Sequence, residues 1–504
     1  MSKKLPIFYS ALLLTGVNLL LRFAGTSFQV YLSGRIGAEG IGLLQLVMSV
    51  GSLAMVIGMA GIRTATMYLA AEERGRGTKK NLPRVLSGCI CYSLICSTVV
   101  AVAVSSFSPF LAEKWIGNPN TEQAIRLIAV FLPVNCLCAV LVGFFTGINK
   151  IKTLAAVEIA EQICSMICTI TLLHFWAGHD PYKSYLAVIL GSGMGACLTL
   201  ASLMLLRLMQ RQPPGAHIPV TSRLLRTAVP LALADNLRTG ISTVENLMVP
   251  KRLALSPGTV SALASFGIVC GMVFPILTFP MAILFGLTEL IIPELARCNA
   301  AGSHHRIQYL VRKCLRIALL FGALCSGILY LSADSLCMRL YNEPMAGTYL
   351  KWFAPLAIML YCDSMTDAMI KGLGQQKVSV LFNITTNIMD VVFLFILLPK
   401  YGITGYFFSF FVTHLINFLL SLRHLLKISK IRINVRTPLL TAACCVLAVI
   451  VCTHIESGLL CAVAFSVILL CGLYLLKVVG KQDILWLSGL VTKEKAGQYS
   501  LPGK

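Results

Sequence analysis

The chain has 504 residues, of which 57% are hydrophobic and 12% are charged, whereas about 25% of the residues of a soluble domain are charged. This composition excludes an ordinary water-soluble enzyme and indicates a membrane protein with many spans. A formal net charge of +22 would suggest a nucleic-acid partner for a soluble protein, but in a membrane protein basic residues mainly set the topology. We therefore expect membrane lipids, and no nucleic acid, to contact the basic connections.

Apolar stretches of about 20 residues, each long enough to cross a bilayer, follow one another along nearly the whole chain. Lys3 and Lys4 precede the first stretch, and most other Lys and Arg residues lie in connections on the same side of the membrane as this terminus. This asymmetry predicts cytosolic N- and C-termini. The connections are too short for a catalytic domain, so we expect no enzyme. The fourteen predicted spans are 6–33, 41–70, 85–108, 122–147, 153–176, 183–209, 224–249, 259–292, 308–332, 348–371, 377–398, 402–424, 436–454 and 458–479.

A polar connection that contains Pro213-Pro214-Gly215 divides the chain after six spans, and the two sides share a polar pattern. Because six is even, both halves start on the same side, which predicts parallel repeats with a substrate site between them. The matching positions are Asn18, Arg22 and Arg35 with Asn236, Arg238 and Lys251, and Gly147 and Lys152 with Gly372 and Lys377. The predicted domains are an N-terminal lobe (1–212), a C-terminal lobe (213–430), two further helices (431–481) and a cytosolic tail (482–504).

Three arginines, Arg22, Arg63 and Arg238, lie within predicted spans, where a charge costs about 2.5–3.5 kcal/mol on insertion scales. Arginine stays charged and binds phosphate in a bidentate manner, so three of them beside one cavity would suit a diphosphate. The alternatives are that each arginine pairs with a nearby carboxylate or extends to the membrane surface. Further basic residues at the ends of spans are expected at the mouth of the cavity: Arg35, Lys251 and Arg252.

Carboxylates also occur within the predicted spans, where exposure to lipid would be unfavourable. Two pairs are spaced i,i+3 and i,i+4, so that each pair shares one face of a helix. These residues are candidates for a wet cavity and for a Na⁺ or H⁺ site, although ion pairing with the arginines explains any one of them equally well. The candidates are Glu158, Glu161, Glu245, Glu289, Asp363, Asp367 and Asp390.

Pro275 and Pro280 lie in the eighth predicted span, where proline bends a helix and frees carbonyl groups. The bend is either the hinge of a gate or a static kink. The sequence contains no G-x4-G-K-[ST] phosphate loop, no H-E-x-x-H and no G-x-S-x-G motif, and its 19 cysteines follow no zinc-binding or disulfide spacing. We therefore expect neither a metal nor another cofactor. We expect transport to be driven by Na⁺, by H⁺ or by the membrane potential.

The pattern of six, six and two spans resembles the multidrug/oligosaccharidyl-lipid/polysaccharide exporter superfamily. The resemblance extends over nearly the whole chain and includes three stretches, 34–45, 249–253 and 291–296. Within this superfamily, the chain is similar to the branch that contains stage V sporulation protein B and the polysaccharide flippases. This branch is related to the lipid II flippases. The resemblance implies a V-shaped transporter of two lobes around a central cavity. In lipid II flippases, arginines of spans 1, 2 and 8 are linked to the substrate diphosphate.

Arg22 matches the arginine of span 1 and Arg63 that of span 2, whereas span 8 carries Glu289 and no arginine, so that Arg238 would have to substitute. We expect a flippase for an undecaprenyl-diphosphate-linked glycan in the bacterial cytoplasmic membrane, working by alternating access in cell-wall, spore-cortex or capsule assembly. The lipid tail would lie along a groove that involves the last two spans. Two alternatives stay open: a Na⁺- or H⁺-coupled multidrug exporter, and a scaffold without transport that binds envelope or spore-wall synthesis enzymes.

Overall fold

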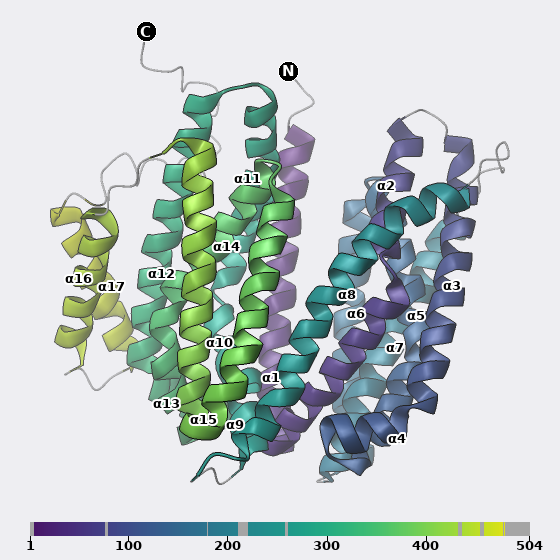
Figure 1. Cartoon of the computed structure of the whole chain (residues 1–504), viewed down its shortest axis with the longest axis horizontal. Helices are drawn as coiled ribbons and strands as arrows, with labels where there is room; N and C mark the ends of the chain where they lie inside the picture. Colours follow the sequence, from purple (N-terminus) through teal and green to yellow (C-terminus); the bar gives the residue numbers. More distant parts are fainter. Residues whose placement is uncertain are drawn as a thin grey trace. The chain divides into compact units, whose positions relative to one another are not determined.

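The computed structural model describes residues 5–75, 79–178, 180–209, 220–257, 261–431, 436–453, 458–476 and 478. Every regular element in these ranges is a helix (Figure 1). Eight of the described helices are long and apolar enough to cross a membrane, or nine if one bent pair counts as a single span. The prediction of an all-helical, multi-pass membrane protein is confirmed, and the number of fourteen spans stays a prediction. The boundary at 212/213 and the tail 482–504 lie outside the described residues.

The chain packs into two compact units, which we call the first and the second unit. The first unit consists of Met1–Leu290 and Val380–Ile416, and the second of Ile291–Ser379 and Asn417–Lys504. The predicted division into lobes stays a prediction.

The first unit contains ten helices, the beginning of an eleventh and the central part of a long later one. Its α-helices are α1 (Leu5–Met59), α2 (Ile62–Gly75), α3 (Leu82–Ser106), α4 (Ser108–Phe110), α5 (Glu122–Gly147), α6 (Ile151–Leu172), α7 (Pro181–Leu208), α8 (Val220–Leu253), α9 (Ala262–Ile268) and α10 (Phe274–Thr278), with parts of α11 (Met281–Ala300) and α15 (Gln376–Ser429). The shorter helical turns between them are η1 (Lys79–Asn81), η2 (Leu111–Ile116), η3 (Pro119–Thr121), η4 (Leu173–Ala177) and η5 (Val269–Val273).

One hydrophobic core of the first unit joins α2, α3, α5, α6, α7 and the beginning of α8. Ile62 and Leu141 are fully buried there, and Leu224 and Ala228 of α8 pack into the same cluster. At the same end, Arg223 of α8 makes ion pairs of 2.6 and 2.8 Å with Glu72 and Glu73 of α2. The beginning of α8 is therefore held to α2 by apolar packing and by charge.

The two longest helices change direction at single glycines. Gly37 interrupts α1 with φ 75° and ψ 173°, and Gly402 interrupts α15 with φ 57° and ψ −138°. Both pairs of dihedral angles are essentially restricted to glycine. Each long helix thus consists of two arms. The arms of α15 correspond to the predicted spans 377–398 and 402–424, whereas the predicted span 41–70 runs past the end of α1 at Met59 into α2.

The second unit contains α12 (His304–Tyr341), α13 (Pro344–Phe353), η6 (Ala354–Leu356), α14 (Ala357–Gly372), α16 (Arg436–Cys452) and α17 (Gly458–Leu475), with the remaining parts of α11 and α15. Its core includes Ala323 of α12, Cys445 of α16 and Phe465 of α17. A side chain at Gly327 would meet the ring of Phe465 at 2.0 Å, so glycine lets α17 approach α12 closely. This packing fixes α16 and α17 on α12.

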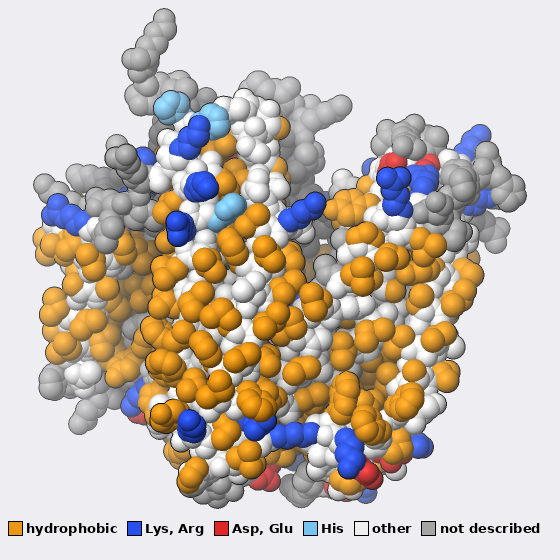
Figure 2. Space-filling model, in the orientation of Figure 1, with side chains coloured by type: hydrophobic (Ala, Val, Ile, Leu, Met, Phe, Trp, Pro, Cys, Tyr) orange, Lys and Arg blue, Asp and Glu red, His pale blue; other side chains and the backbone are white. Residues whose placement is uncertain are grey.

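The surface of the helices divides into zones along their length. Figure 2 shows apolar side chains over the middle of the helices and most of the Lys and Arg side chains near the helix ends. Many large apolar side chains of the described helices are exposed, for example Val99 (64%) and Leu447 (63%). A patch of this size marks contact with lipid in a protein of this composition.

Candidate substrate and coupling sites

Arg22 is half-buried in the first arm of α1 and lies over an aromatic ring. Its guanidinium carbon is 5.4 Å from the centre of the Phe285 ring in α11, a cation–π contact of about 0.5–1 kcal/mol or more when it is desolvated. Arg22 makes no ion pair with any residue that the structure describes. Arg22 therefore does not form an ion pair with a described carboxylate, which was one of the alternatives that the sequence left open.

The other two arginines predicted for the diphosphate are exposed. Arg63 lies on α2, within the electrostatic range of Glu158 on α6 but without a direct ion pair. Arg238 lies on α8, and over the described ranges it also lacks an ion pair. Within the described ranges, none of the three guanidinium groups forms an ion pair.

The basic residues predicted at the cavity mouth lie at the ends of their helices. Arg35 lies near the Gly37 kink, 6.0 Å from the centre of the Tyr31 ring. Lys251 donates a hydrogen bond to the carbonyl oxygen of Lys114, and the Arg252 guanidinium lies 3.4 Å from the centre of the Phe395 ring. Within the first unit, Lys251 and Arg252 thus contact neighbouring helices, whereas Arg35 contacts a ring of its own helix.

Glu245 and Asp390 form a hydrogen-bonded pair of carboxyl groups within the first unit. Glu245 lies on α8 and Asp390, which is 7% exposed, on the first arm of α15. Ser409 and Thr413, on the second arm of α15, donate hydrogen bonds of 2.6 and 3.1 Å to Asp390 Oδ1. Two carboxyl groups can hydrogen-bond only if one of them carries a proton, and two adjacent negative charges in this setting would be strongly unfavourable. The pair is therefore a candidate site for a proton or a cation.

Neighbouring polar contacts fix the position of α8 around this pair. Thr243 donates a hydrogen bond of 3.3 Å to the carbonyl oxygen of Ser49, and Asn246 donates one of 3.0 Å to the Ser49 hydroxyl. A further side-chain hydrogen bond joins Cys270 and the buried Tyr406 beside the pair. Glu245 thus faces Asp390 because its neighbours on α8 are bonded to α1.

Two other candidate carboxylates have polar partners in the first unit or lie beside a charge. Glu161 accepts a hydrogen bond of 2.7 Å from Thr199 of α7, and Glu158 lies in the field of Arg63. The described side chains include no group of three or more His, Cys, Asp and Glu residues arranged to hold a metal ion.

The second unit contains the remaining candidates. Asp363 Oδ2 accepts a hydrogen bond of 3.0 Å from Asn417, while Oδ1 is buried and has no hydrogen-bond partner among the described atoms. Asp367 pairs with Lys371 at 2.5 Å and accepts a hydrogen bond from Ser379. The side chain of Glu289, another predicted cavity residue, lies outside the described part of the chain.

A sharp bend occurs where the sequence contains Pro275 and Pro280. The helical segment 262–278 meets α11 at an angle of 56°, and Pro280 lies in the break between them. The bend agrees with the effect of proline on a helix. Its predicted role as the hinge of a gate stays a prediction.

Four residues beside the carboxyl pair are not among the sequence candidates: Cys270, Tyr406, Ser409 and Thr413. Hydroxyl and thiol groups are common in apolar spans, and each usually bonds to a carbonyl of its own helix. The i,i+4 spacing of Ser409 and Thr413 on one helical face is the signal that points to them. No spacing rule links them to Asp390, because the Gly402 kink brings the two arms of α15 together.

Comparisons with known proteins agree with this fold. A family model described as polysaccharide biosynthesis protein matches residues 8–248, and the MatE family model matches residues 253–396. Stage V sporulation protein B of Bacillus subtilis (strain 168) is 22% identical over 470 residues, which cover 90% of this chain and 89% of that protein. Sporulation protein YkvU of the same organism is 19% identical, over 73% of this chain and 82% of its own length.

Two solved structures share the fold over most of the chain. The lipid II flippase MurJ in an inward closed conformation has a TM-score of 0.67 at 12% identity, and covers 95% of this chain and 100% of its own. An inward-facing multidrug resistance MATE family transporter has a TM-score of 0.65 at 13% identity, and covers 83% and 100%. The chain therefore carries a region similar to the polysaccharide biosynthesis family followed by a region similar to the MatE family, is related to stage V sporulation protein B over most of its length, and has the fold of these two transporters.

Proposed function

We propose that the protein is a flippase for a glycan linked to undecaprenyl diphosphate, in the cytoplasmic membrane of a bacterium and with both termini in the cytosol. The matches to a polysaccharide biosynthesis family, to a sporulation protein and to the fold of a lipid II flippase support a transporter of this class rather than an enzyme. The glycan would be a precursor of peptidoglycan, spore cortex or a surface polysaccharide.

The observation that carries the proposal is the state of Arg22. A permanent positive charge lies within a span, half-buried, and no carboxylate of the described residues neutralises it by an ion pair. A diphosphate offers the bidentate oxygen pairs that a guanidinium prefers, and its binding would remove the cost of the buried charge. Arg63 and Arg238 would complete the diphosphate site as the substrate enters.

The Glu245–Asp390 pair would couple transport to a cation. Binding or release of H⁺ or Na⁺ changes the charge of the pair and the hydrogen bond that joins α8 to α15. The membrane potential would add to this drive, because moving a negative charge outward gains about 2.3 kcal/mol per 100 mV. No nucleotide hydrolysis is required for either contribution.

The first experiment tests the arginine. Arg22→Ala should abolish complementation of a strain that lacks its flippase while the amount of protein in the membrane is unchanged. Arg126→Ala is the matched control, since Arg126 is surface-exposed and paired with Glu122, and it should retain activity. Full activity of Arg22→Ala would refute the diphosphate role.

The second experiment tests the coupling in liposomes that contain the purified protein and a fluorescent polyprenyl-diphosphate sugar. Asp390→Asn keeps the shape of the side chain but removes its charge, so the dependence of flipping on a pH or Na⁺ gradient should be lost. No flipping by the wild-type protein would favour a scaffold. Drug resistance conferred on an efflux-deficient strain, without flipping, would favour the multidrug exporter.

A further inference from the structure

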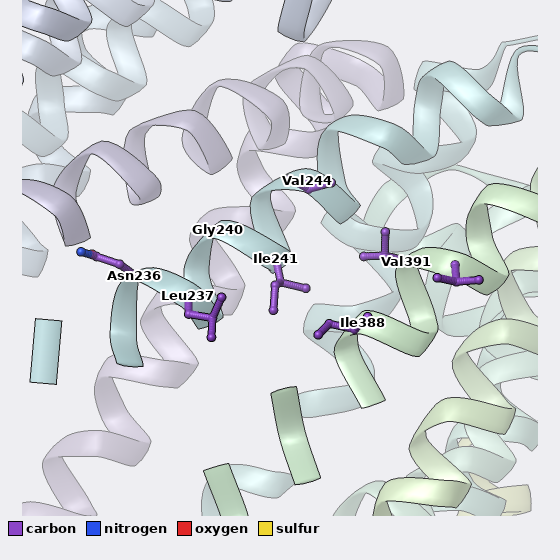
Figure 3. A pocket seen from close by; sticks show the side chains of 8 residues that line it. Asn236, Leu237, Gly240, Ile241, Val244, Ile388 and Val391 are labelled. Carbon is purple, nitrogen blue, oxygen red and sulfur yellow. The ribbon is translucent and has the colours of Figure 1, made fainter. Parts of the chain in front are cut away.

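The first unit contains a groove that the proposed diphosphate and cation sites do not use. It lies between α8 and the first arm of α15 and has a volume of about 340 Å³, at the lower end of the ~300–1,000 Å³ of typical ligand pockets. Figure 3 shows that side chains of the two helices face one another across it. The lining residues are Asn236, Leu237, Gly240, Ile241, Val244, Ile388, Val391 and Val392.

The lining of the groove is apolar and therefore suits a hydrocarbon chain. Six of the eight lining residues are Leu, Ile or Val, and a seventh, Gly240, leaves open space where a side chain would begin. The groove also lies in the middle of α8 and of the first arm of α15. Methyl-branched side chains complement a methyl-branched isoprenoid chain, and burial of such a chain is favourable in proportion to its apolar area.

Polar groups occur at one end of the groove. Asn236 has a buried side-chain oxygen, Oδ1, that lacks a hydrogen-bond partner within the described ranges. Arg238, two residues further along α8, presents an exposed guanidinium without an ion pair to a described residue. An amphiphile with an anionic head near Arg238 and a branched chain over Ile241 and Val244 would match the order of these groups along α8.

From these observations we infer that the α8–α15 groove binds the polyprenyl chain of the substrate, next to its diphosphate. The inference rests on the proposed function and replaces the tail groove expected beside the last two spans. It also links the chain to the cation site, because Glu245 directly follows Val244 and Asp390 directly precedes Val391. A chain in the groove acts on the same two helices that the Glu245–Asp390 hydrogen bond joins, so chain binding and cation binding should affect each other reciprocally.

The test measures binding of polyprenyl diphosphates of increasing length, from geranyl to undecaprenyl, to the full-length protein in lipid nanodiscs. Wild-type affinity should rise with chain length. Ile241→Trp and Ile388→Trp fill the groove and should weaken binding of the long chains by about tenfold or more, which is about 1.4 kcal/mol, while binding of geranyl diphosphate is unchanged. The control is Leu225→Trp, an exposed position of α8 outside the groove.

A second measurement does not depend on the folding of a variant. A polyprenyl diphosphate with a diazirine in its chain should label α8 and α15 of the wild-type protein at the groove residues. Labelling confined to α16 and α17, or a chain-length dependence that the tryptophan variants leave intact, would overturn this inference and leave the proposed function standing. A wild-type protein that binds no polyprenyl diphosphate of any length would overturn both.

Discussion

Replacement of Gly267 by alanine should destabilise the protein, because α9 crosses α1 in direct backbone contact. An added methyl group at Gly267 would lie 2.0 Å from the carbonyl oxygen of Ala38 and 2.7 Å from the amide nitrogen of Gly42. Since such contacts are not found below 3.0 Å, α9 must move away from α1 by about 1 Å. Overpacking of this kind costs about 1–3 kcal/mol, and the better helix propensity of alanine returns about 0.5–1 kcal/mol. We expect a net loss of about 2 kcal/mol, because a backbone contact cannot be relieved by a change of rotamer.

The free energy of unfolding is measured for the purified protein in detergent micelles by titration with a denaturing detergent. Gly34→Ala is the matched control, because an added methyl group there would meet no atom within 4 Å. This control should be as stable as the wild type or more stable by up to about 1 kcal/mol. A Gly267→Ala variant that is as stable as the Gly34→Ala variant would refute the close crossing of α1 and α9.

Three further predictions concern other parts of the first unit. Arg223→Ala removes one ion pair of the Glu73 carboxylate, which is 2% exposed, and should lower the free energy of unfolding by about 1–3 kcal/mol. The loss is smaller than for a fully buried pair, because Arg223 is 28% exposed and Asn81 still donates a hydrogen bond to Glu73; high salt should change the difference in stability from the wild type only slightly. Gly402→Ala forces alanine into a backbone conformation that costs about 1–3 kcal/mol, and circular dichroism during thermal unfolding should show a lower transition temperature. Ser409→Ala removes one of two hydroxyl donors to Asp390 and should cost about 1 kcal/mol of stability and weaken the response of flipping to a cation gradient; an unchanged response would contradict the role of this hydroxyl.

The sequence predicts the class of fold well because the membrane restricts which backbone structures can form. A span must satisfy its backbone hydrogen bonds internally, so apolar stretches of sufficient length become helices. The two arms of α15 agree with two separate predicted spans, and the prolines at 275 and 280 predict the bend that the structure shows.

The partners of the polar residues were harder to predict from the chain. Glu245 and Asp390 both appear among the candidates, but only the packing of α8 against α1 and the kink at Gly402 bring them together with Ser409. Arg22 is among the candidates, yet nothing in its neighbourhood along the chain indicates that it lies over Phe285. Periodicity describes one helix at a time, whereas each of these contacts joins two.

The Glu245–Asp390 pair also has a consequence for biosynthesis. Helix α8 leaves the ribosome long before α15, so Glu245 enters the membrane without its partner. An isolated, ionised carboxylate is unfavourable in the bilayer. Protonated, neutral Glu245 is therefore the form of lower free energy until α15 is inserted. When α15 inserts, Asp390 comes to lie beside Glu245, which is already protonated and can donate the hydrogen bond between the two carboxyl groups. The pair would therefore be assembled with one proton, before any substrate or cation reaches it.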